Sequence, residues 1–155
     1  HGVVDRDEVC LEMKNVDGLE LFENGDLFLD TGSPHHIVFA DSLPGDDFIA
    51  KAKDIRHSEK YNEQGVNVNF VKVSPKLLEM RTFERGVENE TLSCGTGVTA
   101  AAISSHRSGK IDTNIIEVQT SGGRLQVKFK PDGAGYKDIW LIGPATRVFE
   151  GEIEV

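Results

Sequence analysis

The sequence predicts an α+β protein in which a mixed β-sheet is rolled into a barrel-like shape around one buried central helix, with a second helix outside the sheet. Short segments in which apolar and polar residues alternate recur along the chain, and this period is typical of half-buried strands. Residues 95–105, GTGVTAAAISS, carry small side chains on every side and no charge, so a helix here has no polar face. Such a helix is normally enclosed by the rest of the protein.

The totals fit one soluble domain that spans residues 1–155. Hydrophobic residues make up 38% and charged residues 28% of the chain, which is the composition of a globular protein. The formal net charge of -9 argues against a nucleic-acid groove or an anionic membrane surface as partner. No apolar run approaches the roughly 20 residues that a bilayer requires. The 2 cysteines fit a reducing compartment, so we expect a cytoplasmic protein.

The first part of the chain predicts strands and one surface helix. Residues 9–13 alternate in polarity as a half-buried strand does. The Asn24-Gly25 pair indicates a hairpin that leads into a strand through residues 27–29, and residues 35–42 form a further strand. Turn residues then precede apolar side chains at helical spacing, which predicts a surface helix over about residues 46–58.

The second part of the chain predicts the central helix between two groups of strands. The helix covers residues 95–107, and Ser108-Gly109 closes it. Strands are expected before it at GVNVNFVKV (65–73) and KLLEMRTFE (76–84), and after it at NIIEVQTS (114–121), GGRLQVKFK (122–130), KDIWLIGP (137–144) and ATRVFEGEI (145–153).

A cysteine, Cys94, stands directly before the central helix, in the turn SCGTG. The first N–H groups of a helix have no partners inside it and carry partial positive charge, so an anion can dock on them. Gly95 and Gly97 let such an anion come close, and the same field favours a thiolate over a thiol. This turn can therefore hold an acid group and place a proton-transferring sulfur beside it. The alternative is that Cys94 is a small buried hydrophobe.

Charged and amide side chains stand near this turn in the predicted fold. Glu84 and Arg85 end the strand 76–84, and an arginine binds a carboxylate through two parallel hydrogen bonds. The commoner outcome for such a pair is an exposed ion pair. The segment Asn67–Phe70 is, on its own, better explained as an ordinary strand with two exposed amides.

The segment FERGVENETLSCGTGVTAAAI, residues 83–103, resembles the second active-site signature of the diaminopimelate epimerase family. The likeness extends from Leu29 to Ile153 and includes TGSPHHIVF, GVNVNFVKV, SGGRLQVKF and IWLIGPATRVFEGEI in the family's order. Proline racemase-like enzymes have a similar cysteine turn. The Glu84-Arg85-Gly86 approach and the closing GPATRVFEGEI favour the epimerase.

The resemblance implies a protein of two pseudo-symmetric halves, each a mixed sheet rolled around a central helix that begins at a cysteine. Substrate binds between the halves, with neither pyridoxal phosphate nor a metal. One cysteine removes the α-proton as a thiolate, and the other protonates the opposite face, which interconverts LL- and meso-diaminopimelate for lysine and peptidoglycan precursor synthesis. By this likeness the chain is the C-terminal half, and its start without methionine agrees. We expect it to be inactive without the N-terminal half, whose missing surface also favours a homodimer.

The resemblance also assigns roles to individual residues. Cys94 is one of the two acid/base thiols, and the backbone N–H groups of Gly95 and Thr96 hold the reacting α-carboxylate. Glu84 faces the substrate ammonium. The distant carboxylate is held by Arg85 and Asn67, and His35 is a weaker candidate in a stretch that lines the site.

Three features of the sequence qualify this assignment. The family often has asparagine at the position of Ser33, so the distal contact is expected to differ here. The loop VENET, residues 87–91, is one residue longer than usual, which leaves the positions of Glu90 and Thr91 open. Cys10 lies in an alternating strand without a glycine turn or a following helix, so we assign it no catalytic role.

Two other functional classes remain open from the sequence. One is a proline or hydroxyproline racemase, whose substrates lack a distant carboxylate for Arg85 to hold. The other is a non-catalytic half-domain that binds an anion at the glycine turn, with Cys94 only packing. The 5 histidines have no zinc-type spacing with Cys94, so no metal site is expected.

Overall fold

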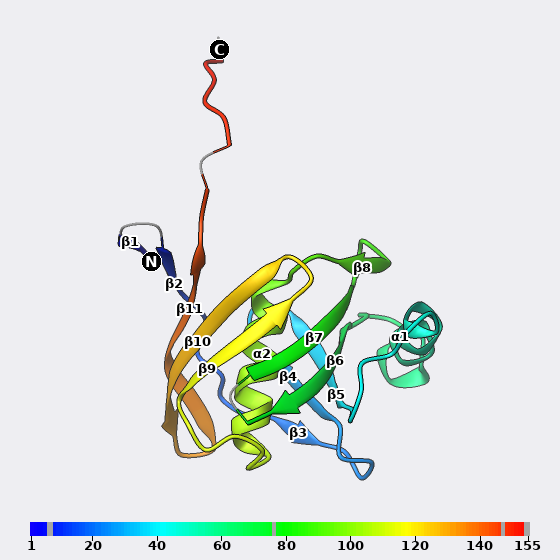
Figure 1. Cartoon of the computed structure of the whole chain (residues 1–155). Coiled ribbons are helices and arrows are strands. Elements are labelled where there is room, and N and C mark those ends of the chain that lie inside the picture. The colour runs from blue at the N-terminus through cyan, green and yellow to red at the C-terminus, as the bar shows by residue number, and fades with distance from the viewer. Residues whose placement is uncertain (6–7, 76, 147, 154–155) are drawn as a thin grey trace.

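Helix α2 (Gly95–Arg107) lies inside a curved β-sheet, and strands from both halves of the sequence pack on it (Figure 1). The computed structural model describes residues 1–5, 8–75, 77–146 and 148–153. Within them α2 contacts seven strands. The strands in chain order are β1 (Gly2–Asp5), β2 (Glu8–Glu12), β3 (Glu20–Leu21), β4 (Leu27–Asp30), β5 (Pro34–Phe39), β6 (Asn67–Ser74), β7 (Leu77–Glu84), β8 (Asn89–Thr91), β9 (Ile115–Thr120), β10 (Gly123–Asp132) and β11 (Gly135–Pro144).

The sheet is mixed, as predicted. Its order over the described residues is β1-β2-β11-β10-β9-β7-β6-β5-β4-β3, with β8 paired to β7. Two neighbouring pairs, β5–β6 and β7–β9, are parallel, and both are joined by connections that contain a helix. The order runs from β1 at one end to β3 at the other without returning, so the sheet curves around α2 but does not close into the expected barrel-like shape.

The apolar core explains why a helix with no polar face forms here. Ala100, Ala101 and Ala102 are fully buried, and their small side chains let the surrounding strands approach α2 closely. The hydroxyl groups of Thr99 and Ser105 donate to carbonyl oxygens one turn earlier in the helix, at 2.9 and 2.8 Å. These polar side chains are therefore satisfied without water. The predicted bounds of this helix, 95–107, are confirmed.

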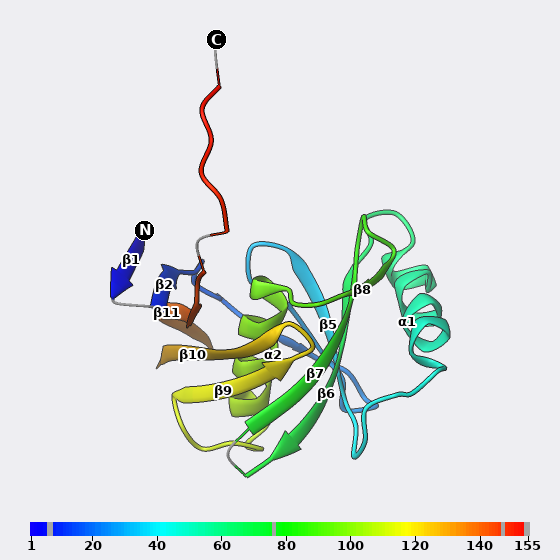
Figure 2. The same ribbon diagram turned by 45° about the horizontal axis from the view of Figure 1, so that its top comes forward.

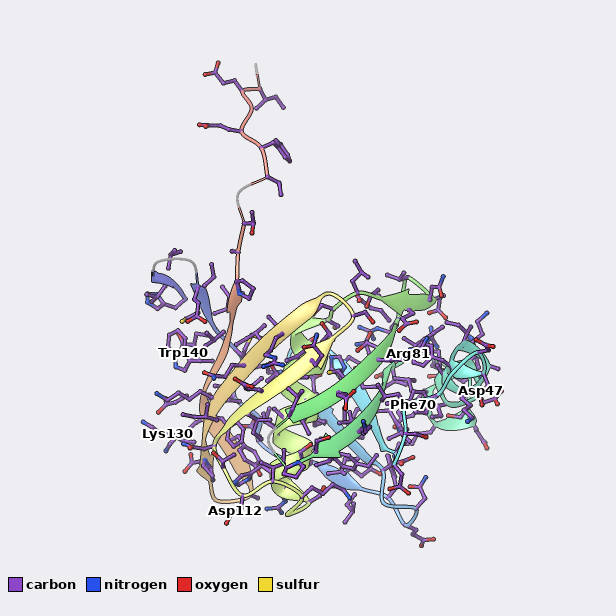
Figure 3. The ribbon with its side chains drawn as sticks, viewed as in Figure 1. Asp47, Phe70, Arg81, Asp112, Lys130 and Trp140 are labelled. Atoms are coloured by element: carbon purple, nitrogen blue, oxygen red, sulfur yellow. The ribbon has the colours of Figure 1, made fainter. Side chains whose placement is uncertain are left out.

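A second helix, α1 (Phe48–Arg56), covers the other face of β6 and β7 and is followed by a short 3-10 turn at Glu59–Tyr61. Figure 2 shows α1 outside the sheet, separated from α2 by these strands. Figure 3 labels Phe70 and Arg81 on the side that faces α1. The Phe70 ring packs edge-on against Phe48 at 5.6 Å, and the Arg81 guanidinium lies 4.1 Å from the centre of the Phe48 ring. The predicted outer helix is confirmed, with shorter ends than expected.

Two strand predictions differ from the structure. No strand forms over residues 145–146 and 148–153 of ATRVFEGEI, because β2 pairs with β11 only as far as Glu8 opposite Pro144. Figures 1 and 2 show this segment leading away from the sheet. Residues 9–13 do include a strand, but Leu11 is 46% exposed, because β1 and β2 lie at the end of the sheet beyond the strands that pack on α2. The predicted strand residues Lys76 and Arg147 lie outside the described residues.

Across the described part of the chain, neither helix combines the length and the apolar character that a membrane span would require.

The alanine face of α2 should tolerate no larger side chain. We expect Ala101→Leu to lower the free energy of unfolding by about 1–3 kcal/mol, because the added atoms meet strands on every side. The measurement is urea unfolding followed by circular dichroism. Ala50, which is exposed on α1, provides the control, and Ala50→Leu should change the free energy by less than about 0.5 kcal/mol. Equal effects of the two substitutions would contradict the packing described for α2.

Candidate functional site

Cys94 is the residue at which α2 begins. Its backbone is extended, with φ -132° and ψ 108°, and its carbonyl accepts the first helical hydrogen bond, from the N–H of Val98 at 2.8 Å. The N–H groups of the first turn consequently have no partner within the helix, and they point toward the cysteine end. Cys94 is half-buried with a free thiol, so its sulfur is not sealed inside the core.

Glycine is required in the first turn of α2 because strand side chains approach it closely. A Cβ at Gly97 would lie 2.7 Å from Oδ1 of Asn69 and 3.2 Å from Cε1 of His35. A Cβ at Gly95 would lie 2.8 Å from the Leu141 side chain of β11. The two glycines that mark the turn in the sequence thus let the helix start sit directly on the sheet.

A small polar cluster joins the helix start to β5. Sγ of Cys94 lies 3.4 Å from Oγ1 of Thr96, which in turn lies 2.9 Å from Nε2 of His35. The hydroxyl of Ser33 is 3.2 Å from Oγ1 of Thr96 and 3.0 Å from Nε2 of His35. The structure therefore brings together four of the residues that the sequence singled out.

Asn67, at the start of β6, extends this cluster toward β7. Its Nδ2 donates to Oγ of Ser33 at 3.1 Å and to the carbonyl of Pro34 at 3.0 Å. Its Oδ1 accepts a hydrogen bond from the backbone N–H of Arg85 at 2.9 Å. Asn67 is buried, so its interpretation as an exposed strand amide is wrong.

Glu84 and Arg85 lie at the end of β7, beside this cluster. The Arg85 side chain is exposed, and its Nη1 donates to the carbonyl of Gln64 at 2.9 Å. A guanidinium has five N–H hydrogens, so this bond leaves the others for an anion. Glu84 is half-buried, and by strand alternation it shares a face of β7 with Thr82, whose hydroxyl donates to a residue under α2. Glu84 and Arg85 form no ion pair with each other among the described interactions.

Two residues of the network were not singled out from the sequence, Asn69 and Thr82. Nδ2 of Asn69 lies 3.0 Å from Nδ1 of His35, and its Oδ1 accepts a hydrogen bond from the Thr82 hydroxyl at 3.0 Å. Both residues are buried on the face of the sheet that meets α2. The sequence could have indicated Asn69 by its position, because it follows Asn67 by two residues and residues two apart lie on the same face of a strand.

The position of Glu90, left open by the sequence, is now defined. Glu90 lies in the short strand β8 opposite Phe83, and Oε1 of its carboxylate accepts a hydrogen bond from Nε of Arg81 at 2.7 Å. This bond lowers the pKa of Glu90 from its ordinary value. Thr91 pairs with Thr82 in the same ladder, so residues 89–91 add a short strand to the sheet.

His35 is neutral near pH 7 because it is buried. Its pKa is lowered from the ordinary value of 6.5 to about 4, chiefly by loss of solvent and to a smaller extent by the charge of Arg85. The charge of Asp30 acts in the opposite direction but does not outweigh burial. A neutral imidazole beside the hydroxyl groups of Ser33 and Thr96 orients them through hydrogen bonds and supplies no charge.

Other groups in the molecule lie apart from this cluster. A pocket of about 520 Å³ is bordered by Phe22, His36, Ile55, Lys60 and Tyr61. The backbone carbonyl of His36 accepts from Asn69, but its ring bonds instead to Tyr61 and Asp26, away from Cys94. Cys10 lies in β2, opposite Val3 and Ile142. Within the described residues, no group of three or more His, Cys, Asp or Glu side chains is arranged to hold a metal ion.

The fold of this chain resembles that of solved structures described as a probable proline racemase and a hydroxyproline epimerase. The structure superposes on a crystal structure of a hydroxyproline epimerase from Agrobacterium vitis with bound trans-4-OH-L-proline, with a TM-score of 0.63 and 17% identity. The match covers 89% of this chain and 50% of that chain. At this identity the likeness concerns the fold alone.

The sequence comparisons define the family. A family model described as diaminopimelate epimerase matches residues 27–148, so the chain belongs to the diaminopimelate epimerase family. It is 45% identical over 150 residues to a diaminopimelate epimerase of Flavobacterium psychrophilum, covering 96% of this chain and 58% of the relative. A diaminopimelate epimerase of Chlorobaculum tepidum is 42% identical over 139 residues, covering 88% of this chain and 53% of the relative. The chain thus spans little more than half the length of these curated relatives.

Gly97→Ala should loosen the contact between α2 and the sheet. Alanine is favoured over glycine in a helix by about 1 kcal/mol. Its methyl group at this position would collide with Asn69 and His35, so we expect a net loss of about 1–2 kcal/mol in the free energy of unfolding. Urea unfolding measures this free energy. Gly18→Ala is the control, because no atom lies within 4 Å of the added Cβ. A stabilised Gly97→Ala protein would contradict the close approach.

The buried neutral His35 should make the fold sensitive to mild acid. The unfolded chain takes up a proton below pH 6.5, whereas the folded chain resists until about pH 4, so stability falls as the pH drops through this window. The contribution is about 2 kcal/mol between pH 7 and pH 5. Urea unfolding at both pH values should show that His35→Gln loses this component of the slope, with His57→Gln as the control for a histidine outside the core. An unchanged slope in His35→Gln would contradict the assignment.

Proposed function

We propose that this chain supplies one acid/base cysteine of a diaminopimelate epimerase, which interconverts LL- and meso-diaminopimelate without a cofactor in the route to lysine and peptidoglycan precursors. The observation that carries the proposal is the position of Cys94, a half-buried residue at the N-cap of α2, directly before a first turn that contains two glycines. The family membership and the names of the relatives support the choice of substrate.

The proposed reaction is a transfer of the α-proton between two sulfurs. In one direction Cys94, as a thiolate, removes the α-proton, and the electron pair of the broken C–H bond stays on the α-carbon. A thiol on the opposite face then donates its proton to that carbon and becomes the thiolate, which inverts the stereocentre. The carbanion is stabilised while its α-carboxylate lies on the N–H groups of Gly95 and Thr96, because these dipoles are fixed before the reaction begins.

The remaining residues fit the two ends of the substrate to different degrees. Arg85 is exposed and keeps N–H groups for the distant carboxylate, so it is the stronger distal candidate. Both Nδ2 hydrogens of Asn67 already serve Ser33 and Pro34, so a direct contact from Asn67 requires exchange of one of these bonds. Ser33, where the family often has asparagine, connects Asn67 to His35 and Thr96. Glu84 is proposed to face the substrate ammonium.

The second thiol and the opposite wall of the site are proposed to come from the other half of the enzyme. The chain spans 58% of the length of the Flavobacterium relative, which supports its assignment to one half of the enzyme. The family-model match over residues 27–148 supports the interpretation of this half as one structural unit. Cys10 lies in a strand with no helix start beside it, so it is not proposed as the second thiol. The chain alone is proposed to be inactive, cytoplasmic and prone to pair with a second copy through the surface that its partner half would cover.

The test is incorporation of deuterium at the α-carbon of diaminopimelate in deuterated water. With the complementary half present, the protein should exchange the α-proton, and Cys94→Ala should slow exchange by about 100- to 10,000-fold because one acid/base group is lost. Cys10→Ala is the matched control and should exchange normally. Undiminished exchange by Cys94→Ala would refute the proposal, and exchange by this chain alone would refute its dependence on a second half.

Arg85 separates diaminopimelate from proline-type substrates. Arg85→Ala should raise KM for diaminopimelate at least about tenfold, because a charge-assisted hydrogen bond contributes roughly 1.5–3 kcal/mol. Arg107→Ala, a change of the same type at the far end of α2, should leave KM unchanged. Full diaminopimelate turnover by Arg85→Ala, together with turnover of proline or hydroxyproline, would favour the racemase. If this chain, combined with its complementary half, binds carboxylates but does not exchange the α-proton, the result would favour the non-catalytic anion-binding domain.

A further inference from the structure

The ring of His35 is held between an amide and two hydroxyl groups, and the amide decides which ring nitrogen carries the proton. Nδ2 of Asn69 lies 3.0 Å from Nδ1 of His35, its nearest acceptor, and the carbonyl oxygens of His36 and Asn67 share its second hydrogen at 3.3 and 3.5 Å. Oδ1 of Asn69 accepts from the Thr82 hydroxyl at 3.0 Å. These partners fix the amide orientation, because carbonyl oxygens accept only from the nitrogen side.

An amide N–H facing Nδ1 requires that Nδ1 be the acceptor. A neutral imidazole has one acceptor and one donor nitrogen, so the proton then resides on Nε2. His35 is fully buried, and burial keeps its ring neutral near pH 7. The Nε2–H donates to Oγ1 of Thr96 at 2.9 Å, with Ser33 as a second neighbour at 3.0 Å.

The remaining hydrogen bonds then follow from counting donors. Oγ of Ser33 accepts from Asn67, and its own hydrogen reaches Oγ1 of Thr96 at 3.2 Å. Oγ1 of Thr96 therefore receives hydrogen bonds from His35 and Ser33, which use its two lone pairs. Its single hydrogen is left to donate to Sγ of Cys94 at 3.4 Å.

We propose that Asn69, supported by Thr82, is a positioning residue that keeps His35 in the Nε2–H form and thereby directs the Thr96 hydroxyl to the sulfur of Cys94. With the opposite tautomer, the Thr96 hydroxyl would turn toward the unprotonated Nε2 and leave the sulfur without this donor. A donor aimed at the sulfur stabilises its thiolate. The proposal rests on the proposed function only for the role of that thiolate in proton transfer, and the tautomer stands independently of it.

The first measurement is the pair of ring ¹⁵N chemical shifts of His35 in this chain at pH 7. We expect a pyridine-type shift for Nδ1 and a pyrrole-type shift for Nε2. Asn69→Asp replaces the donor with an acceptor and should move Nδ1 to a protonated shift. Asn114→Asp, the same change in an exposed turn, should leave both shifts unchanged. A protonated Nδ1 in the unsubstituted chain, or an unprotonated Nδ1 in folded Asn69→Asp, would overturn the proposal. If Asn69→Asp does not fold, the unsubstituted chain decides.

The second measurement is the pH profile of Cys94 alkylation by iodoacetamide, with Cys10 replaced by serine. Thr96→Val should shift the profile to higher pH, and Thr96→Ser, which restores a hydroxyl, should return it toward the original. The charged groups around this network are Asp30 at the end of β4, Glu84 at the end of β7 and Arg85 directly after it. They are the same in all three proteins, so the hydroxyl alone accounts for a difference. If the pH profiles of alkylation for Thr96→Val and Thr96→Ser are superimposable, the proposed hydrogen bond from Thr96 to the sulfur is overturned, whatever the outcome of the epimerase assay.

Discussion

The contact between the first turn of α2 and the neighbouring strands is the constraint on which the rest of the structure depends. At Gly97 the helix backbone lies so close to Asn69 and His35 that a methyl group has no room. This contact determines which strand side chains lie beside Cys94. It also fixes the direction in which the unpaired N–H groups of the helix point, and with it a place near the sulfur where peptide dipoles attract an anion.

The same three strands, β5, β6 and β7, serve both the core and the site. Near the start of α2 their inward side chains are polar, and further along the helix they become apolar. Because the polar set is buried and hydrogen-bonded, each of its members is held by the fold and not by a mobile loop. The inward polar side chains are His35, Asn67, Asn69 and Thr82, and the apolar ones that continue the same rows are Ile37, Val71, Leu78 and Met80.

Much of this organisation could be predicted from local patterns. The central helix was predictable because an uncharged run of small residues has few alternatives to enclosure. Cys94 was a predictable candidate because a cysteine directly before a glycine turn at a helix start has a chemical use. The sheet order and its open ends were not predictable, since strand pairing depends on distant partners. The same limit explains the error at residues 145–153, where the residues suit a strand but no neighbouring strand extends far enough. Asn69 and Thr82 could not be recognised, because their role depends on the ring of His35 across two strands.

Family membership and the geometry at the start of α2 support the same proposed chemistry for this chain. The family model covers strands β4 to β11, the glycine turn and the central helix, and the structure adds the network that orients the hydroxyl groups around the sulfur. A chain with a net charge of -9 repels anions in general. Attraction of a carboxylate to Cys94 must therefore come from the local peptide dipoles and from Arg85.

The most direct test of this account compares two alkylating agents on the folded chain. The ratio of the reaction rates with iodoacetate, which is anionic, and iodoacetamide, which is neutral, reports the local attraction for a carboxylate at each of the two cysteines. The account predicts a higher ratio at Cys94, at the start of a helix, than at Cys10, within a strand, and predicts that unfolding in urea removes the difference. An equal or lower ratio at Cys94 in the folded chain would contradict it.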